Sequence, residues 1–135
     1  MSQFITELDI KPRCDNECIW VLDKPLLYWS QLLKDLYGHP DIVIQKGFET
    51  DLASVPRMPI LYWLWGGRAH YEGVLHDFLY RKNAVPSVKR SVADKVFLEA
   101  MKVRGKSRRV RWPMYFGVRI GGWTAYHKRL VGDKF

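Results

Sequence analysis

The hydrophobic pattern of the chain changes at Gly47, and this change limits the possible folds more than any other feature of the sequence. Before Gly47, apolar and polar residues alternate in short runs, which is typical of strands that bury one face. After Gly47, apolar residues recur every three or four positions, which is typical of helices. The sequence therefore predicts an α+β protein in which a small N-terminal antiparallel β-sheet precedes a bundle of about four helices.

Turn and breaker residues separate the expected elements. The alternating runs predict strands at 4–10, 18–22, 26–29 and 41–44, with a short helix at 31–37. The periodic runs predict helices at 56–65, 69–82, 91–103 and 113–128. At 135 residues the chain has the length of one domain. We therefore expect a strand-rich part (1–48) and a helical part (49–135) that form a single domain.

No segment has the features of an export signal or of a membrane span. The first twelve residues lack a basic region followed by an apolar run. The longest nearly apolar stretch, 55–67, is shorter than the roughly 20 residues that a membrane-spanning helix needs. We therefore expect the protein in the cytoplasm where it is made. Two cysteines, Cys14 and Cys18, lack a second pair to complete a zinc site, and we interpret them as thiols, with a disulfide as the alternative.

Positive charge is concentrated at the C-terminal end of the chain. Of the formal net charge of +8, most comes from residues 102–135, which contain ten Lys and Arg residues against one Asp. Such a segment can bind an anionic lipid surface, an acidic protein or nucleic acid, or it can be a solvated helix. Nucleic acid ranks lower because no recognised reading motif accompanies the charge. Aromatic residues at 59–65 and between 112 and 123 suit a lipid or protein surface that includes Arg108, Arg109, Arg111 and Arg119. The alternative, which is the commoner role of such stripes, is that they belong to the core.

The segment around His76 contains the residues best suited to catalysis. On a helix, His76 and Asp77 point roughly 100° apart and serve different contacts, while Tyr80 follows His76 by one turn. In the next predicted helix, Asp94 interrupts an apolar stripe and so lies at the edge of a buried face. An unpaired buried carboxylate is costly, which makes His76 its natural partner.

A His76–Asp94 pair would have a specific chemical use. A carboxylate that holds one imidazole nitrogen leaves the other nitrogen to accept a proton. We therefore predict that His76, Asp94 and Tyr80 form a catalytic group. The structural alternative is that His76 is an ordinary core residue and that Asp94 caps a helix.

A second polar cluster, GFETDLASVPR at 47–57, joins the last strand to the first long helix. Its side chains can cap that helix, and its oxygen atoms also suit a hard cation. Together with Asp77, a set of oxygen ligands favours calcium over zinc. We predict a Ca²⁺ site with Asp77 and Asp51 as ligands and a surrounding loop of Thr50, Leu52, Ala53 and Ser54.

The run GFETDLASVPR, followed by LHDFLYR and then ADKVFLEAM, resembles a family of phage- and prophage-associated proteins of unknown function. These motifs cover about 46–103. The resemblance implies the same fold and a gene carried by a phage or prophage, and it implies no established activity. The protein would be made in the host cytoplasm, with incorporation into the virion as a further step.

HDFLYRKN followed by ADKVFLEAM is also similar to the core of prokaryotic secreted phospholipases A2. This resemblance implies that His76 activates a water, that Asp77 binds calcium, and that Asp94, supported by Tyr80, orients His76. The disulfides of that family, and the calcium loop of its animal relatives, are absent. Only residues 50–55 are placed to replace that loop.

Two functions remain open at this stage. The first is a phage-encoded, calcium-assisted hydrolase of a lipid or another ester. The second is a noncatalytic virion or tail component whose basic, aromatic C-terminal region binds a neighbouring phage structural protein.

Overall fold

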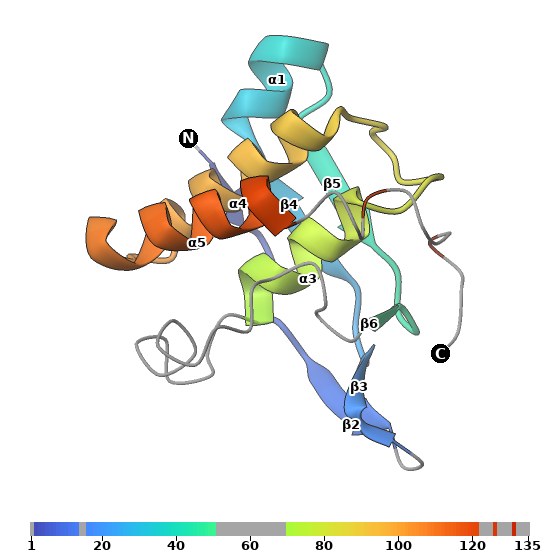
Figure 1. The fold of residues 1–135 in the computed structure, drawn as a ribbon. Coiled ribbons are helices and arrows are strands. Elements are labelled where there is room, and N and C mark those ends of the chain that lie inside the picture. Colours follow the sequence, from blue (N-terminus) through green and yellow to red (C-terminus); the bar gives the residue numbers. More distant parts are fainter. Residues whose placement is uncertain (1, 14–15, 51–69, 122–125, 127–130, 132–135) are drawn as a thin grey trace.

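Two small antiparallel sheets form the N-terminal part of the protein in the computed structural model (Figure 1), which describes residues 2–13, 16–50, 70–121, 126 and 131. The first sheet has the order β1-β4-β5, with β1 at Gln3–Phe4, β4 at Leu26–Trp29 and β5 at Asp41–Ile44. The second has the order β2-β3-β6, with β2 at Ile10–Arg13, β3 at Asn16–Leu22 and β6 at Glu49–Thr50. The α+β class expected from the sequence is confirmed.

The strand predicted at 4–10 is divided between the two sheets, because β1 ends at Phe4 and β2 begins at Ile10. The hydroxyl of Thr6 accepts a hydrogen bond from the Leu27 backbone N–H at 3.0 Å. In regular pairing, the Leu27 N–H would donate to a backbone carbonyl of the neighbouring strand. Here it donates to the Thr6 side chain instead, and the pairing of β1 with β4 ends. The structure therefore has two small antiparallel sheets where the sequence indicated one. β6 also continues the strand-rich part beyond residue 48.

The helix α1 (Gln31–Tyr37) matches its prediction because local signals mark both of its ends. The Ser30 hydroxyl accepts from the Leu33 backbone N–H at 3.1 Å, which caps the first turn. Gly38, with φ of 68°, ends the helix in the left-handed conformation that glycine adopts most readily.

The described part of the chain after β6 contains three longer helices: α3 (His70–Leu79), α4 (Arg90–Val103) and α5 (Arg108–Gly121). The first two agree closely with prediction. The third begins five residues before the predicted start at Pro113 and continues through that proline, so the basic residues before Pro113 form its first turns. Some predictions fall outside the described residues: the helix at 56–65, the whole apolar stretch at 55–67, and Cys14. No helix in the described part of the chain is long and apolar enough to span a membrane.

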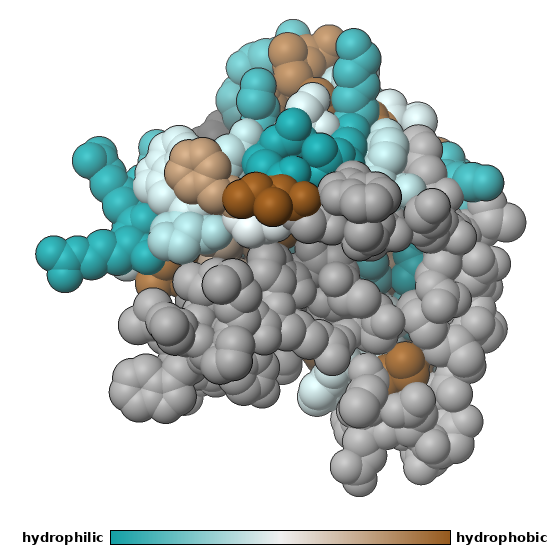
Figure 2. Space-filling view, viewed as in Figure 1, coloured by the Kyte–Doolittle hydropathy of each residue, from teal (hydrophilic) through white to brown (hydrophobic). Residues whose placement is uncertain are grey.

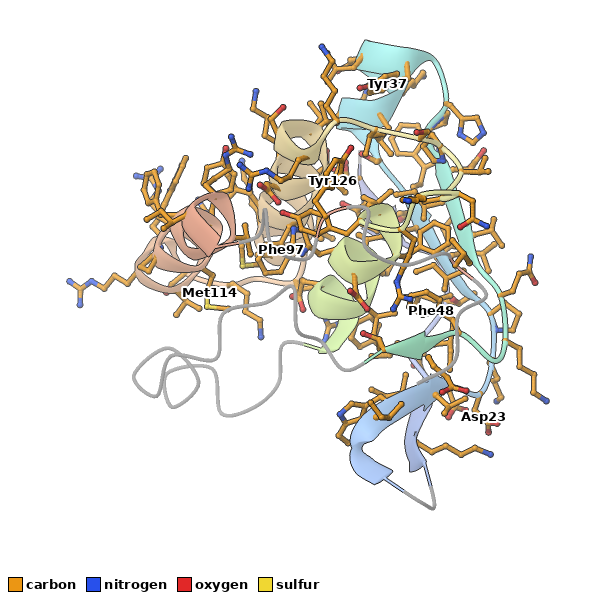
Figure 3. The ribbon with its side chains drawn as sticks, turned by 45° about the vertical axis from the view of Figure 1, so that its right-hand side comes forward. Asp23, Tyr37, Phe48, Phe97, Met114 and Tyr126 are labelled. Carbon is orange, nitrogen blue, oxygen red and sulfur yellow. The ribbon has the colours of Figure 1, made fainter. Side chains whose placement is uncertain are left out.

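The strand-rich and helical parts share one hydrophobic core. It joins β3, β4, β5 and α1 to α3 and α4, through residues that include Leu22, Tyr28, Leu33, Ile44, Leu75 and Val96. A smaller cluster of Phe97, Met101, Met114 and Val118 packs α5 against α4 (Figure 3). The two clusters hold α3, α4 and α5 beside one another, which positions the polar residues between them.

Glu99 connects α4 to the first sheet. Its Oε1 accepts hydrogen bonds from the Tyr28 hydroxyl and the Ser30 hydroxyl, both at 2.8 Å, and its Oε2 accepts from the Leu32 backbone N–H at 3.1 Å. Because one carboxylate satisfies three donors on β4 and α1, the position of α4 relative to the sheet is well determined.

Candidate functional site

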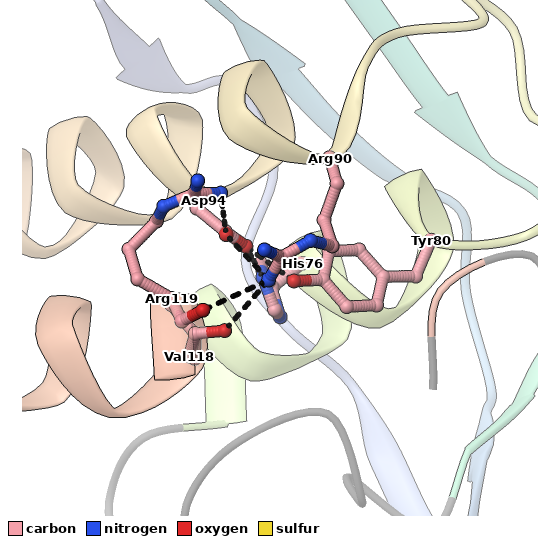
Figure 4. Close-up of polar contacts among 6 residues, drawn as sticks. All are labelled: His76, Tyr80, Arg90, Asp94, Val118 and Arg119. Carbon is pink, nitrogen blue, oxygen red and sulfur yellow. Dashed lines mark hydrogen bonds and ion pairs between the residues drawn. The ribbon is translucent and has the colours of Figure 1, made fainter. Parts of the chain in front are cut away.

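The centre of the site is a pair of side chains on adjacent helices (Figure 4). His76 on α3 lies with Nε2 at 2.7 Å from Asp94 Oδ1 on α4, and neither side chain has any exposed surface. The apolar stripe of α4 is buried and includes Asp94, as the spacing predicted. The pairing expected from the cost of burying an unpaired carboxylate is therefore present.

Asp94 binds more groups than His76 alone. The hydroxyl of Tyr80 donates to Oδ1 at 2.5 Å, and Arg119 Nη1 on α5 donates to Oδ2 at 2.8 Å. Arg90 Nη1, one turn before Asp94, lies 3.7 Å from Oδ2. Both carboxylate oxygens therefore have partners, and the partners come from three helices.

These contacts decide the charge of the site. Burial alone would raise the pKa of Asp94. The hydrogen bonds from His76, Tyr80 and Arg119 lower it by more than burial raises it, so the net shift is downward and the carboxylate stays ionised. Burial and the neighbouring Asp94 charge raise the pKa of Tyr80, which keeps its hydroxyl protonated as a donor. The site holds a fixed negative charge surrounded by donors.

Aromatic rings enclose the imidazole of His76. The ring centroid of Tyr80 lies 4.2 Å from that of His76, and the centroid of Phe97 lies 4.8 Å from it. Tyr80 follows His76 by one helical turn, so it contacts the ring and also shares its carboxylate partner. The orientation of the imidazole is therefore set by packing as well as by the hydrogen bond to Asp94.

Arg90 secures the end of α5 that contains Arg119. Its Nη1 donates to the backbone carbonyls of Val118 at 3.3 Å and Arg119 at 3.1 Å. A cation at the C-terminal carbonyls of a helix is favoured by the helix dipole. Sequence analysis placed Arg119 on a partner-binding surface, whereas the structure places its guanidinium on Asp94. The four-residue spacing of Arg90 and Asp94 was a visible signal for this cation-rich setting.

Asp77 faces away from His76, toward the second sheet, as the 100° angle between neighbouring helical residues predicts. Its Oδ2 accepts hydrogen bonds from the Thr50 hydroxyl on β6 and from Arg81 Nη2 at 3.0 Å. Arg81 Nη2 also donates to the Glu49 carbonyl at 3.0 Å. The predicted proximity of Thr50 and Asp77 is therefore present, and the two residues join α3 to β6.

This arrangement bears on the predicted calcium site. The guanidinium of Arg81 already lies against the Asp77 carboxylate and compensates its charge, which is a poor fit to a divalent cation. Within the described ranges, no group of three or more His, Cys, Asp and Glu residues is placed to hold a metal. Asp51, Leu52, Ala53 and Ser54 lie outside the described residues. The calcium site stays a prediction.

Glu72 is a buried acid to which sequence analysis gave no role. It lies one turn before His76 on α3 and has no exposed surface. Among the residues that the structure describes, neither of its carboxylate oxygens has a hydrogen-bond partner. Burial raises its pKa above the ordinary value, against the opposing charges of Lys106 and Arg104. The signal in the sequence was an acidic residue four positions before His76.

The predicted surface arginines divide into two groups. Arg108 and Arg109 are exposed at the start of α5, and Arg111 is partly buried with Nη1 at 3.2 Å from the Lys106 carbonyl. Arg119 lies at the other end of the helix, on Asp94. The basic surface is therefore concentrated on the first turns of α5.

Together these features define a class: a small α+β protein with a buried His–Asp pair, held by a tyrosine and an arginine, between packed helices. The chain belongs to the DUF1353 family, described as a protein of unknown function, whose sequence profile matches residues 20–118. That range begins within β3 and stops three residues before the end of α5, so it includes every residue of the His76–Asp94 group except Arg119. No curated protein and no solved structure shows a significant match to the chain.

Proposed function

We propose that the protein is an ester hydrolase in which His76 is the general base and Asp94 its orienting partner. The 2.7 Å contact between His76 Nε2 and Asp94 Oδ1 is the observation that carries the proposal. An ionised carboxylate only accepts hydrogen bonds, so Nε2 bears the proton in a neutral imidazole. Nδ1 is then the atom that takes up a proton during the reaction.

The reaction follows from this tautomer. His76 Nδ1 removes a proton from a water molecule while the water oxygen attacks the carbonyl carbon of the ester. The resulting tetrahedral intermediate expels the alcohol, which takes the proton from Nδ1, and the carboxylic acid remains. Asp94 stabilises the imidazolium that forms between these steps. Tyr80 and Arg119 hold Asp94 in place and keep it ionised.

Access to His76 is a requirement of this mechanism. Because the imidazole has no exposed surface in the observed arrangement, neighbouring groups must move before an ester can reach it. The predicted calcium site with Asp77 and Asp51 as ligands is a separate proposal: those residues would hold the ion, and the ion would supply Lewis-acid polarisation of a carbonyl, but the steps above do not depend on it. A calcium ion there would share Asp77 with Arg81.

A second candidate function is a noncatalytic virion or tail component, and the complete burial of His76 and Asp94 favours it. A buried His–carboxylate pair joins helices even where no reaction occurs. The basic, aromatic end of the chain would then bind a neighbouring phage protein. In both candidates we propose a phage or prophage gene, synthesis in the host cytoplasm and, for the second, incorporation into the particle.

The deciding experiment compares hydrolysis of a chromogenic short-chain ester and of a phospholipid by the wild type, His76→Asn and His39→Asn, each with calcium and with a chelator. His39 is exposed and distant in sequence from the site, so its variant is the matched control. We expect His76→Asn to lose about 10²- to 10⁴-fold in rate, the usual contribution of a general base. Circular dichroism checks that both variants are folded. Equal rates for His76→Asn and the wild type would overturn the hydrolase proposal.

A test of the second candidate uses purified particles. A structural component is present at a fixed number of copies per particle and is inactive on both esters. An active protein that is absent from particles contradicts this candidate.

A further inference from the structure

The helix α5 exposes apolar side chains on the surface that faces away from the core. Met114 and Val118 are buried against α4, at 1% and 0% exposure. On another side of the same helix, Trp112, Phe116 and Ile120 are 41%, 55% and 77% exposed. Their four-residue spacing aligns them in one row along the helix, which we call the outer row. Apolar side chains are visible over α5 in Figure 2.

Aromatic packing holds the first part of this row together. The Trp112 ring centroid lies 5.9 Å from that of Tyr115 and 5.9 Å from that of Phe116, and the rings of Tyr115 and Phe116 are 5.7 Å apart. Trp112 and Phe116 are exposed, whereas Tyr115 is partly buried and also packs against the Phe97–Met114 cluster, so it anchors the two outer rings to the helix pair. A partner therefore meets an already ordered aromatic surface, which reduces the entropy lost on binding.

The charged residues of α5 all have one sign. The sequence of α5, RRVRWPMYFGVRIG, contains four arginines and no acidic residue. Arg108 and Arg109 are exposed one turn before Trp112. The complementary surface is therefore anionic and also offers an apolar layer to the outer row.

We propose that α5 docks on an anionic lipid bilayer, with the outer row in the interfacial region and Arg108 and Arg109 at the phosphate groups. Nucleic acid offers the required charge but no apolar layer for Ile120, the most exposed of the three side chains. The row is a ridge on one helix, and a ridge enters a fluid interface without needing a shaped groove. Tryptophan and tyrosine rings favour the interface itself, with the apolar body inward and the polar edge outward.

The docking helix is joined directly to the candidate site. Arg119 lies between Phe116 and Ile120 in the sequence, and its guanidinium donates to Asp94 at 2.8 Å. A bilayer bound to the outer row would thus lie against α5, the helix whose Arg119 binds the orienting carboxylate. The substrate class then follows as a lipid ester, and this last step rests on the proposed hydrolase function, whereas the docking does not.

The test measures co-sedimentation of the full chain with phosphatidylcholine vesicles that contain or lack phosphatidylglycerol. We expect binding to the anionic vesicles that weakens as salt is raised. The double variant Phe116→Gln, Ile120→Gln should bind at least about tenfold more weakly, because it removes two apolar groups from the interface. The variant Arg108→Gln, Arg109→Gln should lose the preference for anionic vesicles.

Matched controls use exposed residues outside α5. Ile5→Gln, Val85→Gln changes apolar side chains that are 52% and 65% exposed, and Lys82→Gln, Lys95→Gln removes two exposed charges; both should bind as the wild type does. Absence of vesicle binding, wild-type binding by the outer-row variant, or binding of DNA or an acidic protein through the outer row in place of vesicles overturns the docking proposal. Hydrolysis of a soluble ester without vesicle binding also overturns docking and leaves the hydrolase proposal standing. Vesicle binding without hydrolysis of any ester supports docking and overturns the hydrolase proposal.

Discussion

Arg119 Nη1 donates a hydrogen bond to Asp94 Oδ2 at 2.8 Å, and this contact ties α5 to the helix pair that contains His76. The other carboxylate oxygen accepts from His76 and Tyr80 on the α3 side. Asp94 is thus the junction of three helices. Any function of His76 depends on the same carboxylate that holds the helices together, so catalytic and structural effects must be separated by experiment.

Replacing Asp94 by Asn tests the charge of this junction. Asn has nearly the same shape but no charge, so His76 and Arg119 lose their anionic partner. We expect the free energy of unfolding at pH 7 to fall by about 3 kcal/mol, as when one member of a buried ion pair is removed. Urea denaturation measures this loss. A variant as stable as the wild type would show that the charge contributes nothing to the fold.

The lowered pKa of Asp94 predicts how the free energy of unfolding falls at acidic pH. Its pKa is lowered in the folded protein, so its stabilising contribution is fully present above its ordinary value of 3.8 and is lost as the pH falls through the lowered folded value. Urea denaturation from pH 2.5 to 7 should show this loss in the wild type. In Asp94→Asn this component should be absent, and parallel acid limbs in the two proteins would contradict the assignment.

Tyr80→Phe removes only the hydroxyl that donates to Asp94. A hydrogen bond to a charged group contributes about 1.5–3 kcal/mol, and the ring contact with His76 is retained. We expect a loss of that size in urea denaturation. Tyr37→Phe is the matched control because Tyr37 is 43% exposed, and its stability should not change. Equal losses in the two variants would assign the effect to something other than Asp94.

Glu72→Met should stabilise the protein. It removes two buried oxygens that have no hydrogen-bond partner in the described part of the chain, for which the usual cost is about 1–3 kcal/mol. Glu99→Met is the contrasting variant, because Glu99 accepts three hydrogen bonds and its loss should destabilise. A decrease in stability for Glu72→Met would show that Glu72 has a structural partner.

The gain from Glu72→Met should depend on pH. Burial raises the pKa of Glu72, so the folded protein keeps a proton that the unfolded chain releases. Wild-type stability therefore falls as the pH rises from the ordinary value of 4.5 through the raised folded value. The positive charges of Lys106 and Arg104 reduce this upward pKa shift without reversing it. Urea denaturation at pH 4, 5.5 and 7 should show a growing gain, and a constant gain would contradict the protonation.

The calcium prediction has a thermal test. If Asp77 and residues 51–54 bind calcium, the melting temperature rises with the logarithm of the calcium concentration above Kd. Asp77→Asn should abolish that rise, whereas Asp41→Asn, which changes an exposed carboxylate on β5, should leave it intact. A melting temperature that does not respond to calcium in the wild type would contradict the proposed calcium site.

Parts of the site could be read from the sequence because their signals are local. The stripe of α4 has helical spacing, so burial of Asp94 followed from its position among Val92, Ala93 and Val96. The one-turn spacing of His76 and Tyr80 likewise placed both residues on one side of α3. The division of the first strand could not be read this way, because it depends on Thr6 meeting Leu27, 21 residues away.

By itself the sequence determined the α+β class, the positions of α1, β4 and β5, and the need for a partner at Asp94, since periodicity, caps and burial costs act within a few turns of the chain. Only the tertiary structure decided that Arg119 donates to Asp94 and that Arg81 and Thr50 donate to Asp77. Those contacts join residues that, apart from Arg81 and Asp77, are 25 or more positions apart. Which cation or hydroxyl reaches a carboxylate depends on how the helices and sheets pack, and many residues of the right chemistry compete for each place until packing selects one.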